Sequence, residues 1–282
     1  MSADIFASQP GNEDLLAEIY DLEHDDVVED LPFHRELVRR SGGRVLDLGC
    51  GSGRLFTSLF EGGASRVIGV DASGALLRRA EARIANDPAL AAAAADGRLV
   101  LHRGVVRALA TLNIRERFDL ALAVGVVPHL DGPEDALRLL GGVRSLLAAG
   151  GRLLIDDLGP SAMPQRDLPL SVDWRRELNG REVVRRSELI RRESPEGLRV
   201  AFSTIADAVQ PDGTIARLPA SHRLWYPSPE ALAALVVQAG MVIELSYGSH
   251  DLEPLGRESG RRIVVVNYKP AATSASQEER VG

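Results

Sequence analysis

The residues of this chain that are best suited to chemistry gather around one glycine-rich turn, Gly49-Cys50-Gly51-Ser52-Gly53. The short apolar run from Val45 to Leu48 precedes it and predicts a buried parallel strand. Glycines at alternate positions allow the backbone to turn sharply and to approach a ligand closely. The residues after Gly53 are compatible with a helix, so the sequence predicts a small-molecule site between a strand and a helix.

The spacing of the glycines separates the possible ligands. A dinucleotide fingerprint requires G-x-G-x-x-G. Here the third glycine comes one residue early, and an acid, Asp47, lies two residues before the first glycine. The chain also has no G-x-x-x-x-G-K-[ST] motif, so a nucleoside triphosphate is not supported. The glycine spacing therefore disfavours a nicotinamide-dependent enzyme, which would have a doubly wound sheet, and we keep it only as a weak alternative.

The glycine turn and the segment after it resemble a known family. The run D-L-G-C-G-S-G, followed by the strand-like Val67 to Asp71, resembles motif I and the next acidic motif of the class I S-adenosylmethionine-dependent methyltransferases. The resemblance extends from about Tyr20 to Lys269 and is strongest over residues 44–86. It implies an α/β fold with a doubly wound, Rossmann-like, seven-stranded sheet, and S-adenosylmethionine as the cofactor.

The resemblance also implies a set of cofactor contacts. In the family, the glycine loop lies against the methionine part of the cofactor, and the acid that ends the second strand binds both ribose hydroxyls, which one carboxylate can do. The alternative for that acid, Asp71, is a helix-capping or surface role. The contacts expected here are Tyr20, Asp47, Gly49, Cys50, Gly51, Gly53, Asp71, Ala72, Gly104, Val105 and Val124.

Val105 is a departure from the family pattern. The family usually has an acid here, which holds the amino group of adenine. Val105 can pack on the adenine ring but cannot accept a hydrogen bond from its amine. Adenine recognition must therefore rest on a backbone carbonyl or on another side chain.

His129 is the leading candidate for chemistry on the methyl acceptor, with Tyr20 as its partner near the methyl donor. Residues 125–130 follow the predicted strand Phe118 to Val124, and ligands bind beyond the carboxyl ends of such strands. In small-molecule members of the family, a histidine in a similar x-x-x-H-L segment lies near the substrate, and imidazole titrates near neutrality. The alternatives are a hydrogen-bonded structural histidine and a half-buried core tyrosine.

Further substrate candidates follow the predicted fifth strand, Arg152 to Ile155. Asp156 and Asp157 suggest acid-base work or a metal. Without nearby histidine or cysteine ligands we expect no metal, and we favour for this pair a substrate contact, made by Asp156, or plain loop acids. Trp225 and Tyr226 can supply the apolar walls of a pocket, and each is equally compatible with a place in the core.

The chain divides into four parts. Residues 1–43 are expected to form a helical cap, in which the acids from 23 to 30 form a solvated face. Residues 44–157 and 227–269 form the cofactor-binding core. Strand-like segments and turns over residues 158–226 predict an inserted antiparallel meander. The resemblance implies that it serves as a lid, a substrate wall or a dimer face, as comparable insertions do in relatives with small substrates. Residues 270–282 are predicted to be disordered.

Composition limits the partners. The net charge of −7 argues against a nucleic-acid partner, which normally needs a basic surface. Cys50 is the single cysteine, so no disulfide framework is expected. We find no apolar run long enough to span a membrane and no signal-peptide pattern, so the cytoplasm is the expected compartment.

These observations predict a methyltransferase that acts on a nitrogen or oxygen of a small molecule. Nitrogen is slightly preferred, because the inserted meander resembles that of amino-sugar and other natural-product methyltransferases. Two alternatives stay open. A protein or RNA methyltransferase should show a basic groove or an N-P-P-Y-type site, and the chain has neither. A non-catalytic cofactor-binding sensor or scaffold is compatible with the missing acid at Val105. A homodimer is possible.

Overall fold

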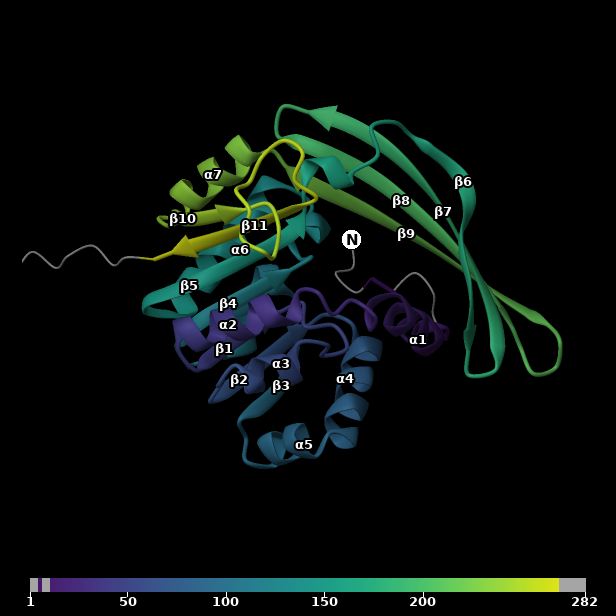
Figure 1. Ribbon diagram of the computed structural model, residues 1–282, viewed down its shortest axis with the longest axis horizontal. Coiled ribbons are helices and arrows are strands. Elements are labelled where there is room, and N and C mark those ends of the chain that lie inside the picture. Colours follow the sequence, from purple (N-terminus) through teal and green to yellow (C-terminus); the bar gives the residue numbers. More distant parts are fainter. Residues whose placement is uncertain (1–4, 7–10, 269–282) are drawn as a thin grey trace, which may run out of the picture.

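The computed structural model describes residues 5–6 and 11–268 (Figure 1). The predicted tail, residues 270–282, lies outside these residues. The helices are α1 (Glu13–His24), α2 (Leu31–Ser41), α3 (Phe56–Glu61), α4 (Gly74–Asn86), α5 (Pro88–Ala95), α6 (Pro133–Leu146) and α7 (Pro229–Gln238), with the 3-10 turns η1 (Val106–Leu112), η2 (Val127–His129) and η3 (Pro160–Ala162). In the described part of the chain, no helix is long and apolar enough to cross a membrane.

Seven strands form the main sheet, in the order β10-β11-β5-β4-β1-β2-β3. They are β1 (Arg44–Leu48), β2 (Arg66–Asp71), β3 (Leu99–Arg103), β4 (Phe118–Val124), β5 (Leu147–Leu158), β10 (Val242–Tyr247) and β11 (Arg261–Asn267). The first five strands pair in parallel, and β11 pairs antiparallel with both β5 and β10. This topology confirms the predicted doubly wound sheet.

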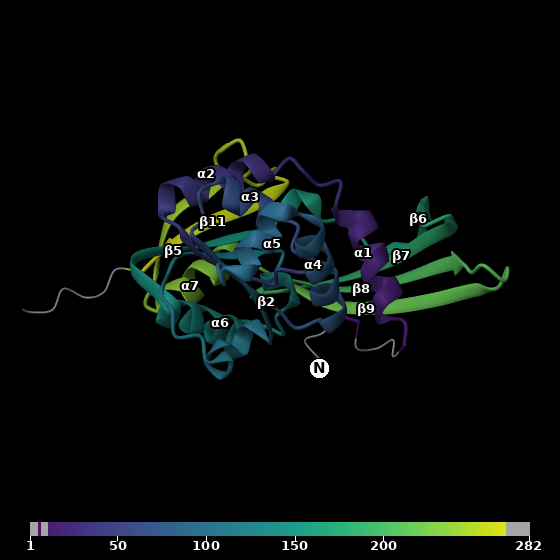
Figure 2. The same cartoon turned by 90° about the horizontal axis from the view of Figure 1, so that it is seen from below.

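Helices cover both faces of the sheet, which is why its strands are apolar on both sides. Helices α6 and α7 lie on one face, and α2, α3, α4 and α5 lie on the other (Figure 2). Their buried side chains belong to two separate core clusters. In β1, Leu46 faces the first core and Val45 the second, and both are fully buried. The sheet therefore fixes the glycine turn that follows β1 in the middle of the molecule.

A second, four-stranded sheet forms the predicted meander and arches away from the main sheet (Figure 1). Its strands are β6 (Leu168–Leu178), β7 (Arg181–Ser194), β8 (Gly197–Val209) and β9 (Ile215–Pro227), and each pairs antiparallel with the next. One face, which we call the inner face, packs on α1. Val183, Ala206 and Leu218 on this face share a buried cluster with Leu16 and Ile19. The meander therefore meets the N-terminal helix over the core.

The fifth strand is longer than predicted. β5 begins at Leu147 instead of Arg152, and the Gly150-Gly151 pair lies inside it instead of ending the preceding helix. The strand also continues to Leu158, because residues 152–158 pair with β11. Asp156 is therefore a strand residue, and the prediction of a loop acid at this position is wrong.

Candidate active site

The glycine turn between β1 and α3 is tightly held by its neighbours. Gly49, Gly51 and Gly53 have φ angles of 66°, 56° and 80°, a region that favours glycine. A Cβ atom at Gly49 would lie 2.7 Å from Val126 Cγ2, and a Cβ at Gly51 would lie 3.3 Å from the hydroxyl oxygen of Tyr20. The turn therefore lies between the segment after β4 and the N-terminal helix, and side chains at these positions would fill the space beside it.

Asp71 holds the turn from the end of β2. Its Oδ2 accepts a hydrogen bond from the Gly51 N–H at 2.9 Å, and its Oδ1 accepts one from the Ser73 N–H at 2.8 Å. The cap of α4 is Ser73, whose hydroxyl accepts from the Leu76 N–H, so Asp71 does not cap that helix. The carboxylate is half-buried at the carboxyl edge of the sheet. Ligands of such sheets bind beyond this edge, and the ribose contact of Asp71 stays a prediction.

Asp47 is a buried acid beneath the turn. Its side chain is 2% exposed, and its Oδ2 has no hydrogen-bond partner. Burial raises the pKa of this carboxyl to about 7, and the positive charge of Arg54 only partly opposes the effect. An unpartnered buried carboxylate is costly, and a cationic ligand group would remove that cost.

Tyr20 lies against the turn from α1. Its ring stacks on His24 with 4.0 Å between centroids, and its hydroxyl is close to Gly51. Burial and the negative charge of Asp71 raise its pKa well above the usual value, so the hydroxyl stays protonated and can donate a hydrogen bond. The side chain is half-buried. The structure thus brings Tyr20 to the glycine turn, as the prediction requires.

The remaining predicted cofactor residues lie along the same edge. Gly104 follows β3 and donates its N–H to the Asp71 carbonyl at 2.8 Å, and Val105 precedes η1. Val124 ends β4 and is half-buried. Cys50, in the turn, is 8% exposed. Ala72 follows Asp71, and its carbonyl accepts a hydrogen bond from Arg103.

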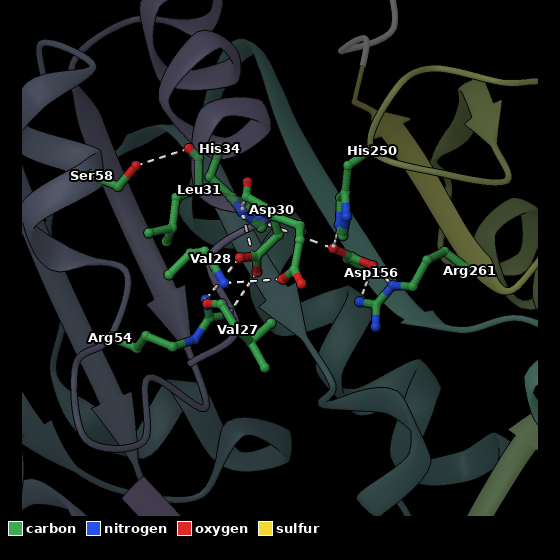
Figure 3. A network of polar contacts seen from close by, with 11 residues as sticks. Val27, Val28, Asp30, Leu31, His34, Arg54, Ser58, Asp156, His250 and Arg261 are labelled. Atoms are coloured by element: carbon green, nitrogen blue, oxygen red, sulfur yellow. Dashed lines mark hydrogen bonds and ion pairs between the residues drawn. The ribbon is translucent and has the colours of Figure 1, made fainter. Parts of the chain in front are cut away.

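A polar network ties the N-terminal cap to this turn (Figure 3). Arg54, directly after the turn, donates to both carboxylate oxygens of Asp30 at 2.7 and 2.6 Å and to the Val27 carbonyl at 2.6 Å. Asp30 is only 3% exposed. The prediction of a solvated acidic face is therefore wrong at Asp30, because a cation from the core neutralises it there.

Asp156 belongs to the same network. It is fully buried on β5, and it accepts hydrogen bonds from His250 Nε2 at 2.8 Å and from Arg261 Nε at 3.0 Å (Figure 3). Burial would raise its pKa, but the bond to His250 and the charge of Arg261 outweigh burial and hold the pKa below its usual value. The side chain is 0% exposed, so the predicted substrate contact would require this network to open.

His129 lies in η2, beyond the carboxyl end of β4. Its side chain is exposed to solvent. Partial desolvation by the surrounding protein and the nearby His222 lower its pKa to about 4. The imidazole is therefore neutral at pH 7. An alkylammonium with a pKa of about 10 would resist giving it a proton by roughly 8 kcal/mol, so His129 is suited to accept a hydrogen bond and not to deprotonate such a group.

The two aromatic candidates differ. Trp225 is 1% exposed and packs in the main core, so the core alternative holds for it. Tyr226 is half-buried, and burial together with the charge of Asp157 raises its pKa to about 12. Asp157 itself is fully buried, and burial raises its pKa to about 7.

Two site features were missed in the sequence. His222 on β9 lies edge-on to His129, with 6.2 Å between ring centroids. Glu23, at the end of α1, binds Arg185 of β7 at 2.6 Å and Trp174 Nε1 of β6 at 3.1 Å. The meander and the N-terminal helix are thereby joined beside the site. No local pattern marks these residues, because each pair comes from segments far apart in the chain.

The strand order, the glycine turn after β1 and the acid at the end of β2 together define a class I methyltransferase fold with its cofactor edge. The chain belongs to the methyltransferase family: a family model described as "Methyltransferase domain" matches residues 26–246.

Solved structures show the same fold at low sequence identity. The CcbJ methyltransferase from Streptomyces caelestis is 19% identical, with a TM-score of 0.69 and coverage of 96% of this chain and 100% of that chain. The sugar N-methyltransferase KedS8 from Streptoalloteichus sp. is 21% identical, with a TM-score of 0.67 and coverage of 89% and 93%.

A third similar structure is CalS10 from Micromonospora echinaspora, an amino pentose methyltransferase solved with S-adenosylmethionine. It is 18% identical, with a TM-score of 0.63 and coverage of 89% of this chain and 97% of that chain. A search of curated proteins found no match.

Proposed function

We propose that this methyltransferase uses S-adenosylmethionine to methylate an amino nitrogen of a small, sugar-like molecule. The main observation in favour of this cofactor is the glycine turn, which is hydrogen-bonded to Asp71 on one side and lies against Tyr20 on the other. The similar structures support both parts of the proposal, since one was solved with this cofactor and two are described as sugar N-methyltransferase and amino pentose methyltransferase.

The residues at the site fit this cofactor. Asp71 would accept hydrogen bonds from the ribose hydroxyls, and the unpartnered Oδ2 of Asp47 would receive the amino group of the methionine part. Tyr20 would donate its hydroxyl proton near the methionine end. Val105 and Val124 would pack on the adenine. The space beside Gly51, which a Cβ atom would narrow, would take the chain between ribose and amino group.

The bound cofactor supplies an electrophilic methyl group on a positively charged sulfur. The protein's own task is then to orient the acceptor and to keep water away from it. His129 would accept a hydrogen bond from the acceptor and so aim its lone pair. The sulfonium charge would keep this imidazole neutral, in agreement with its lowered pKa.

The low basicity of His129 favours nitrogen over oxygen as the methylated atom. An imidazole with a pKa of about 4 is a weak general base for removing the proton of an alcohol. An amine that arrives without its proton needs only orientation, because its lone pair is already nucleophilic. The macromolecular alternative has less support, since the net charge is −7 and phosphate-rich partners need basic surfaces.

The test is a comparison of aminodeoxy sugars with their parent sugars, for example kanosamine with glucose. Each is incubated with the protein and S-adenosylmethionine, and S-adenosylhomocysteine is measured. We expect product with an amino sugar and none with the parent. His129→Gln, which keeps a hydrogen-bond acceptor, should retain more activity than His129→Ala. Wild-type rates in His129→Ala would remove the proposed role of this residue, and methylation of the parent sugars would overturn the preference for nitrogen.

Two finer points are part of the same proposal. We expect the enzyme to work in the cytoplasm and to have no nucleic-acid partner. If the protein forms a homodimer, we propose that the interface includes the edge strand β6, whose apolar side chains Leu170 and Val172 are 48% and 59% exposed. Sedimentation of wild type and Val172→Glu would test this assignment, because the charge should dissociate a dimer formed there.

A further inference from the structure

We infer that His222, on β9 of the meander, is a second acceptor-binding residue, and that His129 and His222 together recognise an acceptor with a hydrogen-bond donor on the carbon next to the reacting amine. This inference rests on the proposed function and deepens it. It assigns to the meander a direct part in choosing the acceptor.

The two imidazoles come from different parts of the fold and meet at one place. His129 belongs to η2 of the core, and His222 lies on the inner face of β9, opposite Phe202 of β8. The rings of His129 and His222 lie edge to face, with 6.2 Å between centroids and 87° between planes. Val126, three residues before His129, lies next to the glycine turn, because a Cβ atom at Gly49 would come within 2.7 Å of Val126 Cγ2. The pair therefore lies beyond the carboxyl end of β4, in the segment that borders the glycine turn.

Neither imidazole has a hydrogen-bond or ion-pair partner within the described residues. Three other histidines do have partners: His24 bonds to the Tyr20 carbonyl, His34 to the Asp30 carbonyl and His250 to the Asp156 carboxylate. Packing alone does not require polar rings at positions 129 and 222. Ring nitrogens that are left unpaired within the described residues are available to a ligand.

The charges around the pair determine what that ligand can be. Burial and the charge of Arg185 lower the pKa of His222, so both rings are neutral hydrogen-bonding groups at pH 7. Arg185 lies over Phe202, 5.5 Å from its centroid, and is itself neutralised by Glu23 and Asp173. With its arginine already paired, this part of the inner face suits an uncharged amine or hydroxyl better than a phosphate.

The separation of the rings sets the spacing of the donors. A ring nitrogen accepts N–H or O–H at about 2.8–3.0 Å. Two imidazoles that meet edge to face can each reach one donor when the donors are on neighbouring carbon atoms of one small molecule. The acceptor class is therefore a vicinal amino alcohol, with the amine at His129 and the hydroxyl at His222.

The experiment compares two probes with a vicinal oxygen and similar amine basicity that differ in the second donor: trans-2-aminocyclohexanol, and trans-2-methoxycyclohexylamine, whose ether oxygen cannot donate. Binding to the protein saturated with S-adenosylhomocysteine is followed by NMR of labelled histidine side chains. The amino alcohol should shift both His129 and His222 and bind on the order of 5-fold more tightly, the value of one added hydrogen bond.

The variants separate recognition from structure. His222→Phe keeps an aromatic ring without nitrogen. It should reduce the ratio of the affinities for the two probes to about one and leave the binding of S-adenosylhomocysteine unchanged. His222→Asn keeps an acceptor atom and should retain part of the preference. Equal affinities in wild type, an unchanged preference in His222→Phe, or no binding of either probe would overturn the inference. Failure of wild type to bind S-adenosylhomocysteine would instead remove the proposed function itself.

Discussion

Replacing Asp47 with asparagine should stabilise the free protein at alkaline pH and weaken its binding of S-adenosylmethionine. The side chain is 2% exposed and Oδ2 has no hydrogen-bond partner, so the ionised form is poorly solvated. Burial raises its pKa from 3.8 to about 7. The folded state therefore binds this proton more strongly than the unfolded state, and the free energy of unfolding falls as pH rises from 4 through 7.

The size of the effect follows from the pKa. A pKa that rises from 3.8 to about 7 corresponds to a free-energy difference of about 4 kcal/mol between the protonated and ionised forms of the folded protein. At pH 8 the wild-type carboxylate is ionised, so Asp47→Asn should raise the free energy of unfolding by about 2–4 kcal/mol. At pH 5 the carboxyl is protonated in the folded wild type but largely ionised in the unfolded chain, so the variant should be more stable by only about 1–2 kcal/mol. The difference between them should therefore grow with pH.

Cofactor binding should change in the opposite direction. The amino group of the cofactor favours the ionised carboxylate, so at pH 7 wild type should release about half a proton on binding. The variant should release none from this site. Its affinity should fall by about 1.5–3 kcal/mol, the value of a hydrogen bond to a charged group.

The assays are urea unfolding at pH 5 and pH 8, and titration calorimetry with S-adenosylmethionine in two buffers of different ionisation enthalpy. Asp96→Asn is the control, because Asp96 is 66% exposed and distant from the glycine turn in the sequence. Asp47 would not have the proposed role if Asp47→Asn were less stable than wild type at pH 8, or if it bound the cofactor with the same affinity and proton release.

Two other substitutions test how the site is held. Gly49→Ala places a side chain at a φ of 66° and puts its Cβ 2.7 Å from Val126 Cγ2, so urea unfolding should show a free energy of unfolding lower by about 2–4 kcal/mol. The control is Gly213→Ala, where φ is 83° but the space is open, and its free energy of unfolding should fall by only about 1–2 kcal/mol. Equal losses of stability in the two variants would mean that the contact with Val126 does not matter. Arg54→Met leaves Asp30 buried and without its cation, and unfolding should show a loss of about 3–5 kcal/mol. A loss below about 1 kcal/mol would mean that this pair does not hold the cap.

The fold was predictable where the pattern is local. The apolar runs, the glycine turn after β1 and the proline and serine at the start of α7 each lie within a few residues, and the structure has these elements. The extension of β5 to Leu158 was not predictable, because residues 156–158 are made part of the strand by pairing with β11, about a hundred residues later.

The site shows the same division. Asp71 and the glycines are adjacent in sequence to the strands that place them, so their gathering at one edge follows from parallel topology. Asp30 was misread as solvated because its partner, Arg54, is 24 residues away. His222 was missed because the curved meander brings β9 to η2, and nothing near residue 222 encodes that contact.

The central claim is that this site binds S-adenosylmethionine through Asp71 and the glycine turn. The most direct measurement is isothermal titration with S-adenosylmethionine and S-adenosylhomocysteine, with NAD as the ligand control and Asp71→Ala as the protein control. We predict micromolar binding of both adenosyl ligands by wild type, its collapse in Asp71→Ala, and no binding of NAD. Absence of binding by wild type, or equal binding by the variant, would contradict the claim.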